Sequence, residues 1–148
     1  MVVIPTHDEM ILIGKSRHAY LSTASSDGVP HLIPICFAFD GQYFYSAIDQ
    51  KPKRAVGKPL KRVRNILSNP NVALLLDHYE EDWRRIWYLL VIGNAYVLEK
   101  DDSHTRAFEL LEDKYYQYRA MDLVGSSIIR ITPSRFINWS GEDKKVNL

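Results

Sequence analysis

Short apolar runs separated by turn dipeptides constrain the fold of this chain more than any other feature. The strand-prone runs cover residues 20–24, 29–39 and 42–46, and the dipeptides Asp27-Gly28 and Asp40-Gly41 stand between them. Asp-Gly is a strong signal for a tight hairpin turn. This order predicts three consecutive strands joined by tight turns, the pattern of an antiparallel meander.

The second of these runs contains Pro30 and Pro34. A proline has no N–H group to donate to a strand ladder. Pro34 therefore predicts an edge, a bulge, or a place where something other than another strand takes up the pairing. A ligand is one such candidate.

Helical spacing predicts three helices: one ending near Gly14, one over residues 60–67, and one over residues 102–115. The first begins with a capping box, in which the Thr6 hydroxyl and the Glu9 carboxylate satisfy free backbone amides. The second stops at an Asn-Pro pair, because the residue before a proline avoids helical dihedrals.

Four further strands are predicted, over residues 72–76, 86–98, 128–131 and 136–139. Gly93 predicts a bulge or bend within the longest of them, and Pro133 separates the last two. Six or seven strands with three marginal helices predict a small, mainly β, antiparallel barrel of the α+β class. The length of 148 residues fits one domain, residues 1–148.

The charge of the chain is segregated, although its net value is only +1. Seven of the 19 cations fall in one stretch without acidic residues: Lys51, Lys53, Arg54, Lys58, Lys61, Arg62 and Arg64. An acidic cluster follows at Asp77, Glu80, Glu81 and Asp82, which we interpret as a solvated turn and not as a metal site. The near-neutral balance excludes a globally basic nucleic-acid binder.

The basic stretch leads from a predicted strand ending in Tyr45-Ser46 into the start of the second helix. Cations in such a loop, together with free amides at a helix N-terminus, suit a phosphate group. The competing interpretation is an exposed loop that only increases solubility.

Several other chemistries lack their defining residues. The chain has no glycine-rich dinucleotide or P-loop motif, no hydrolase nucleophile elbow and no H-E-x-x-H zinc motif. Cys36 cannot form an internal disulfide and lies in an apolar run, which predicts a buried, inert thiol and a reducing cytoplasm. No apolar stretch reaches the roughly 18 to 20 residues of a membrane span.

A set of motifs in this order resembles the pyridoxamine-phosphate-oxidase-like, flavin-binding split-barrel superfamily. The matching segments are Leu21-Ser22-Thr23-Ala24, Asp27-Gly28-Val29-Pro30-His31, Pro34-Ile35, Phe39-Asp40-Gly41, Phe44-Tyr45-Ser46, Lys51-Pro52-Lys53, Arg64-Asn65-Ile66, Asn69-Pro70-Asn71-Val72-Ala73 and Ile131-Thr132-Pro133-Ser134-Arg135. Asp77, Tyr79, Asp82-Trp83 and Trp87 look most like the branch of probable deazaflavin (coenzyme F420) oxidoreductases.

The resemblance implies a homodimer of six-stranded split barrels with FMN or coenzyme F420 in a groove at the dimer interface. It places Ile33, Pro34 and Ile35 against the ring. It assigns the phosphate to Ser46, Lys51 and Lys53, with Arg54 or Arg64 nearby and Asn65 at the helix start. It also includes Ala47 among the cofactor-binding residues. It offers Trp83, Trp87 and Trp139 as covers for the ring or substrate from the other subunit.

The activity implied is hydride transfer between the cofactor and a small organic acceptor, with no need for a protein nucleophile. A proton donor stays open among Tyr45, Tyr79, Tyr88 and His31. Seven cations exceed the need of one phosphate, which mildly favours coenzyme F420 with its polyglutamate tail.

Two functions of other classes stay open. The first is a flavin-binding module for storage, sensing or carriage without turnover. The second is a small barrel that binds single-stranded nucleic acid through a basic loop and exposed aromatic residues.

Overall fold

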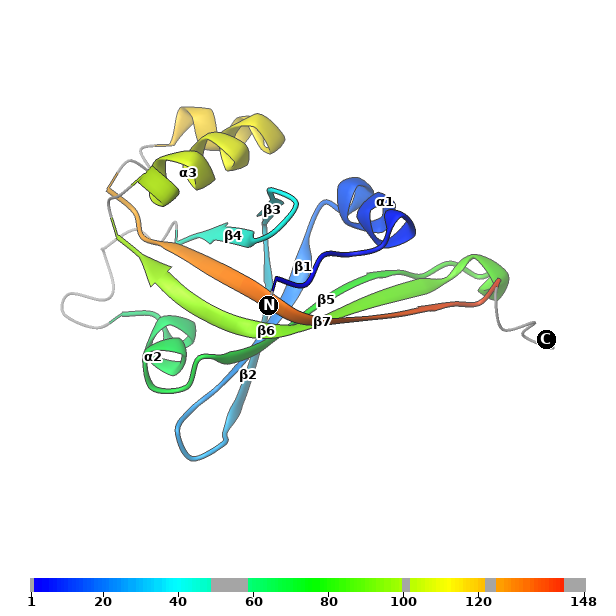
Figure 1. Ribbon diagram of the computed structural model, residues 1–148, viewed down its shortest axis with the longest axis horizontal. Helices are drawn as coiled ribbons and strands as arrows, with labels where there is room; N and C mark the ends of the chain where they lie inside the picture. Colours follow the sequence, from blue (N-terminus) through cyan, green and yellow to red (C-terminus); the bar gives the residue numbers. More distant parts are fainter. Residues whose placement is uncertain (1, 49–58, 100–101, 122–124, 143–148) are drawn as a thin grey trace.

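The computed structural model describes residues 2–48, 59–99, 102–121 and 125–142 (Figure 1). Its elements in chain order are α1 (His7–Lys15), β1 (Ala19–Ala24), β2 (Pro30–Ile35), β3 (Ala38–Phe39), β4 (Phe44–Ala47), α2 (Lys61–Ser68), β5 (Asn71–His78), β6 (Trp87–Leu98), α3 (Asp102–Lys114) and β7 (Ile128–Ser140). The fold is mainly β with marginal helices, as predicted, and within these residues it has seven strands.

All seven strands form one antiparallel sheet in the order β2-β1-β5-β6-β7-β4-β3. β2 and β3 lie at opposite edges of this order, yet only Cys36 and Phe37 separate them in the chain. Two residues cannot span a flat seven-stranded sheet, because neighbouring strands are about 4.8 Å apart. The sheet therefore curls until its edges approach each other, which is the geometry of a split barrel.

The prediction of one strand over residues 29–39 is wrong, because the strand breaks at Cys36 and Phe37. At the break, the N–H of Phe37 donates to the Tyr115 hydroxyl at 3.1 Å, so a side chain from beyond α3 replaces a strand partner. The predicted meander is confirmed only as two separate hairpins: β1 pairs with β2 and β3 pairs with β4, but the break at Cys36 and Phe37 puts the two hairpins at opposite ends of the strand order. The two Asp-Gly hairpin turns are confirmed.

The prediction of two separate strands around Pro133 is wrong as well, since β7 runs unbroken through it. Pro133 lies opposite Gly93, at the point where the register between β6 and β7 shifts. A Cβ on Gly93 would overlap the carbonyl oxygen of Thr132, so only glycine lets β7 come this close. The extra residue, Ser134, donates its hydroxyl to the carbonyl of Ile92 at 3.0 Å. The predicted bulge at Gly93 is confirmed.

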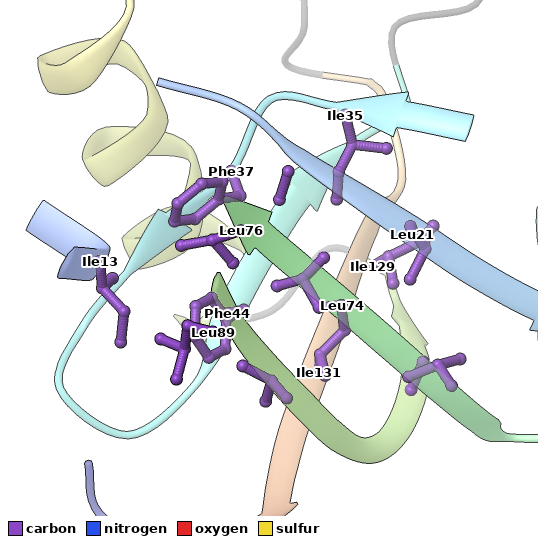
Figure 2. Close-up of a cluster of buried hydrophobic side chains, with 14 of the residues drawn as sticks. Ile13, Leu21, Ile35, Phe37, Phe44, Leu74, Leu76, Leu89, Ile129 and Ile131 are labelled. Atoms are coloured by element: carbon purple, nitrogen blue, oxygen red, sulfur yellow. The ribbon is translucent and has the colours of Figure 1, made fainter. Parts of the chain in front are cut away.

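The barrel interior holds the main hydrophobic core (Figure 2). Its fully buried side chains include Leu21, Phe37, Phe44, Leu74, Leu76, Leu89, Val91 and Ile131. They come from alternate positions of five strands and from the β2–β3 connection, as the period-two alternation of a strand requires. A second core cluster lies between α3 and the outer side of β4 and β7, where Tyr45 and Ala47 pack against Leu111.

The predicted helices are present. In the capping box of α1, Glu9 N–H donates to the Thr6 hydroxyl at 3.2 Å, and Thr6 N–H donates to the Glu9 carboxylate at 2.9 Å. Just after α3, Tyr115 and Tyr118 pack in the second core cluster, whereas Tyr116 is 72% exposed. Among the described residues, none of the helices has the length and apolarity needed to cross a membrane.

Candidate cofactor groove

Helix α2 presents its positive end together with uncompensated cations. The helix packs on β1 and β6, burying Val63 and Ile66 and leaving Lys61 and Arg64 exposed. Its first turn has no acidic residue, and its cap residue is Leu60, which has no acceptor. Cations at a helix N-terminus are unfavourable because the macrodipole is positive there. A bound anion would be attracted to both the cations and the helix end, and it would accept hydrogen bonds from the free backbone amides.

Lys61 acts electrostatically on Asp27, a carboxylate in the β1–β2 turn. A hydrogen bond from the Ser25 hydroxyl, with a smaller contribution from Lys61, lowers the pKa of Asp27. The two side chains form no ion pair. Lys61 therefore keeps its charge largely available to a ligand.

Asn65, expected at the start of the helix, is the fifth residue of α2 and faces the sheet. Its side-chain amide donates to the Thr23 hydroxyl at 3.0 Å, with 2% of Asn65 and 1% of Thr23 exposed. Thr23 had no assigned role in the sequence. Its sequence signal is that Thr23 carries the only hydroxyl among the inward-facing residues of β1. The pair fixes α2, and hence its cations, against β1.

Replacement of Asn65 by alanine is expected to destabilise the fold by about 1–3 kcal/mol, because a buried hydroxyl loses its donor. Chemical denaturation of Asn65→Ala measures this, with the exposed Asn71→Ala as the matched control. The double variant Asn65→Ala/Thr23→Val should recover part of the loss. A double variant less stable than the single one contradicts the assignment.

β2 is an edge strand, and residues 33–35 alternate across it. Ile35 is buried in the core, Ile33 is half-buried, and Pro34 is exposed. His31 lies on the same face as Ile33, opposite Thr23, and its Nδ1 is buried without a hydrogen-bond partner among the described residues. A buried polar atom in a folded protein is usually hydrogen-bonded, and a ligand at this end of the sheet would supply that partner. It is the second feature at this end that points to a polar ligand.

Ser46 and Ala47 end β4, just before the undescribed part of the basic stretch. Ser46 is 3% exposed, on the barrel face opposite Ile129, and its hydroxyl makes no hydrogen bond within the described residues. Ala47 is on the α3 face. Lys51, Lys53, Arg54 and Lys58 lie outside the described residues, so their roles stay predictions.

Tyr45 is poorly suited to donate a proton in this groove. Its hydroxyl donates to Asp40 at 2.8 Å, on the outer face under α3. Burial, followed by the Asp40 hydrogen bond, raises its pKa above the ordinary value for tyrosine. Its side chain stabilises the β3–β4 turn, where Asp40 also accepts from the N–H groups of Gln42 and Tyr43.

The three tryptophans lie far from α2. They occur in the arm, by which we mean the far ends of β5, β6 and β7 with the turn at residues 79–86, at the opposite end of the molecule from α2 (Figure 1). Trp87 and Trp139 line a cleft of about 800 Å³ between α1 and the arm. Trp139 stacks on Tyr88 with 6.0 Å between ring centroids, and Trp83 is 44% exposed.

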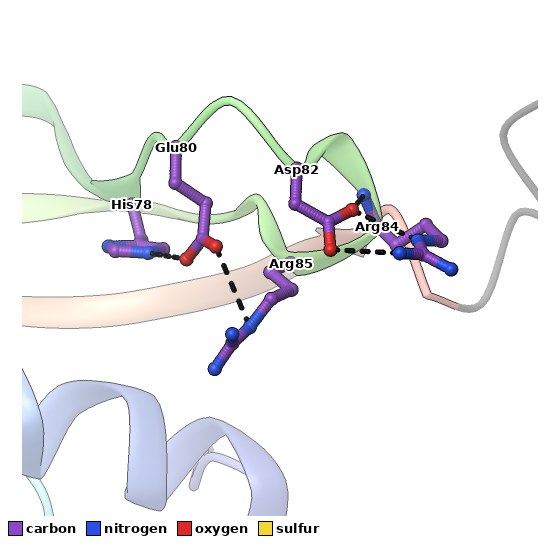
Figure 3. A network of polar contacts seen from close by, with 5 residues as sticks. All are labelled: His78, Glu80, Asp82, Arg84 and Arg85. Atoms are coloured by element: carbon purple, nitrogen blue, oxygen red, sulfur yellow. Dashed lines mark hydrogen bonds and ion pairs between the residues drawn. The ribbon is translucent and has the colours of Figure 1, made fainter. Parts of the chain in front are cut away.

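Two carboxylates of the acidic cluster, Glu80 and Asp82, form ion pairs inside the arm (Figure 3). Asp82 accepts from Arg84 at 2.9 Å, which lowers the pKa of Asp82, and Glu80 contacts His78 at 2.6 Å and Arg85 at 3.6 Å. No group of three or more metal-ligating side chains occurs in the described ranges. The ion pairs of Glu80 and Asp82 are therefore made with side chains of the arm itself, and not with Lys61 or Arg64.

The structure thus brings together part of the predicted set and separates the rest. Arg64 and Asn65 lie in α2. Asn65 contacts Thr23 on β1, and Thr23 pairs with His31 on β2. In the arm lie the tryptophans. One chain cannot cover a ligand at α2 with side chains from its own arm, so both sets can meet only if a second copy contributes its arm.

The chain belongs to the pyridoxamine 5'-phosphate oxidase family, whose model matches residues 6–140. It has no significant match among curated proteins. A conserved hypothetical protein of Mycobacterium tuberculosis superposes with a TM-score of 0.75 at 19% identity, covering 99% of this chain and 91% of that one.

Two further solved structures have the same fold. The heme storage protein HutZ of Vibrio cholerae gives a TM-score of 0.71 at 14% identity, covering 90% of this chain and 92% of that one. A putative pyridoxamine 5'-phosphate oxidase of Listeria innocua gives 0.65 at 21% identity, covering 88% and 94%. At these identities the likeness shows the fold alone.

Proposed function

We propose that the chain is a flavin-type oxidoreductase that binds FMN or coenzyme F420 and transfers a hydride to or from a small organic acceptor. The observation that carries this is the anion seat at α2: exposed cations lie at a positive helix end without a side-chain cap, near a buried histidine nitrogen that has no partner among the described residues. Family membership supports a flavin as the group whose phosphate fills it.

The residues present fit such a group. Lys61 and Arg64, with the predicted ligands Lys51, Lys53 and Arg54, would hold the phosphate, and the Ser46 hydroxyl is available to donate to it. The edge strand at Ile33 and Pro34 offers backbone groups that no neighbouring strand takes up. The bound ring supplies hydride chemistry, while the chain's own residues bind, orient and exclude water.

We include a homodimer in the proposal, because exposed apolar side chains lie on the outer face of the sheet. Leu32 is 66%, Tyr88 38% and Ile92 37% exposed. Leu32, Ser22, Ala73 and Ile92 follow one another across four strands in register. A second copy on this face would cover the row and bring its arm, with Trp83 and Trp87, to the first copy.

The single thiol favours the cytoplasm as the compartment of the protein.

Neutralising Lys58, Lys61 and Arg62 to alanine is expected to weaken coenzyme F420 binding more than FMN binding, by about tenfold. The polyglutamate tail of F420 adds carboxylates beyond the phosphate, and each charge-assisted contact contributes about 1.5–3 kcal/mol. Fluorescence titration of both cofactors measures the two losses. Equal losses contradict the preference for F420.

Turnover separates the leading function from a flavin carrier. Purified protein loaded with reduced FMN or F420 is mixed with a quinone or an enone, and loss of the reduced cofactor is followed by absorbance. Enzyme-dependent oxidation that saturates with acceptor supports the oxidoreductase. A bound cofactor that reacts no faster than the free one indicates the storage, sensor or carrier module.

The fold shared with a heme storage protein makes heme the second ligand to test. Heme iron needs an axial side chain such as histidine. Among the described histidines, His78 is held by Glu80, whereas His31 has a nitrogen without a partner. Retention of heme that His31→Ala abolishes, without retention of FMN or F420, would replace the oxidoreductase proposal by heme binding.

A further inference from the structure

A second hollow lies between α1 and α3, away from α2. Its volume is about 280 Å³, and most of its wall is apolar: Met10, Ile13, Phe37, Phe39 and Leu110. Arg17, just after α1, and Lys114, in the last turn of α3, also line it. No carboxylate does. We call it the Lys114 pocket.

The two cations of the Lys114 pocket lack counter-charges. The Lys114 ammonium lies 3.6 Å from the centroid of the Phe37 ring, and the Arg17 guanidinium carbon lies 4.9 Å from that of Tyr115. Arg17 also donates to the backbone carbonyl of Lys114 at 2.9 Å. Neither forms an ion pair within the described ranges. Aromatic faces stabilise cations, but they do not neutralise them.

Burial makes this arrangement costly for the protein alone. Desolvation, followed by repulsion from Arg17, lowers the pKa of Lys114 to about 8. Removing a charge from water without an anionic partner costs free energy. An anion placed between Lys114 and Arg17 would supply it.

The walls of the pocket are already fixed. The Tyr115 hydroxyl accepts from the N–H of Phe37 at 3.1 Å and lies 2.7 Å from the carbonyl of Arg17, which it reaches as a donor. This one hydroxyl ties the β2–β3 connection to the end of α1 and to α3. A pocket held in shape by hydrogen bonds loses little entropy when a ligand enters.

We propose that the Lys114 pocket binds a small organic carboxylate with an apolar body, separately from the cofactor groove. The carboxylate lies between Lys114 and Arg17, and the apolar body lies against Phe39, Leu110 and Ile13. Size favours an aryl or short-chain acid, since the volume is at the lower end of ligand pockets, which hold about 300–1,000 Å³. The proposal does not depend on the flavin function.

The test uses phenylacetate and its neutral analogue phenylacetamide as probes, with the full chain in calorimetric or NMR titrations. Phenylacetate is expected to bind with a dissociation constant of about 1 mM, and phenylacetamide at least about tenfold more weakly. Lys114→Met should weaken phenylacetate at least about tenfold, while Lys114→Arg, which keeps the charge, should stay within about threefold of the wild type.

A second variant keeps the test decisive if Lys114→Met does not fold. A Cβ at Gly14, which lines the pocket, meets open space, so Gly14→Leu fills it and leaves both cations in place. Gly14→Leu should abolish phenylacetate binding and leave FMN or F420 binding unchanged. The proposal is overturned if phenylacetate does not bind, if the amide binds equally well, or if neither Lys114→Met nor Gly14→Leu alters binding.

Discussion

Reversing two charges on α2, in Lys61→Glu/Arg64→Glu, is expected to weaken FMN or F420 binding by about 100-fold. Both side chains are exposed, near the positive end of the helix, and neither forms an ion pair with a carboxylate in the part of the chain that the structure describes. Each is expected to contribute a charge-assisted contact of about 1.5–3 kcal/mol, so the loss of both exceeds a factor of 100 before screening by salt. Fluorescence or absorbance titration with each cofactor gives the ratio.

The control for this prediction is a second double variant that changes the net charge by the same amount but lies away from α2. Arg106→Glu/Arg119→Glu alters exposed residues on α3 and in the 3₁₀ helix Tyr116–Ala120 that follows it. It should leave the cofactor affinity within about threefold, because at physiological salt the Debye length is about 8 Å. If both pairs weaken binding equally, the effect is one of net charge, and the assignment of the anion seat to α2 is wrong.

Phe44→Ala is expected to destabilise the fold by about 3–5 kcal/mol, the range for truncation of a buried phenylalanine. Phe44 is completely buried and contacts rings on both sides, with centroids 4.3 Å from Phe39 and 5.8 Å from Phe37. The wall formed by β3, β4 and β7 cannot collapse freely into the cavity, because Phe44 pairs directly with Ile131 in the sheet. Urea denaturation measures the loss.

Tyr116→Ala supplies the comparison for Phe44→Ala. Tyr116 is an aromatic residue of similar size that is 72% exposed, so its truncation should cost no more than about 0.5 kcal/mol. Similar losses at the two positions would mean that Phe44 does not lie in the barrel core. Because Phe37 and Phe39 flank the Lys114 pocket, Phe44→Ala should also weaken phenylacetate binding.

Features encoded by neighbouring residues could be predicted from the sequence. The two Asp-Gly turns place Gly28 and Gly41 at φ values of +86° and +99°, which a glycine adopts without strain. The capping box of α1 depends on residues three apart. These signals need no knowledge of distant parts of the chain, and all of them are confirmed.

Features that depend on distant residues could not be predicted in the same way. The strand over residues 29–39 breaks because the hydroxyl of Tyr115, 78 positions beyond Phe37, accepts the hydrogen bond of the Phe37 N–H. β7 continues through Pro133 because Gly93 stands opposite it. In both places a tertiary contact outweighs the local preference of the residues for or against a strand.

The candidate site shows the same division. The basic stretch and the helix that follows it were identifiable from composition and spacing, and Lys61 and Arg64 lie in the first half of α2, where we propose that an anion binds. The motif that placed Asn65 at the helix start could not show that its amide is committed to Thr23. Nor could any motif indicate the Lys114 pocket, which combines the end of α1, the β2–β3 connection and α3.

The most direct test of the central claim is the visible absorption spectrum of the purified protein after it is mixed with FMN, F420 or heme in turn and the unbound fraction is removed. We expect FMN or F420 to be retained at about one molecule per chain in the wild type, and to be lost in Lys61→Glu/Arg64→Glu. Retention of heme alone, retention of none of the three, or undiminished retention in the α2 variant would contradict the proposed flavin function.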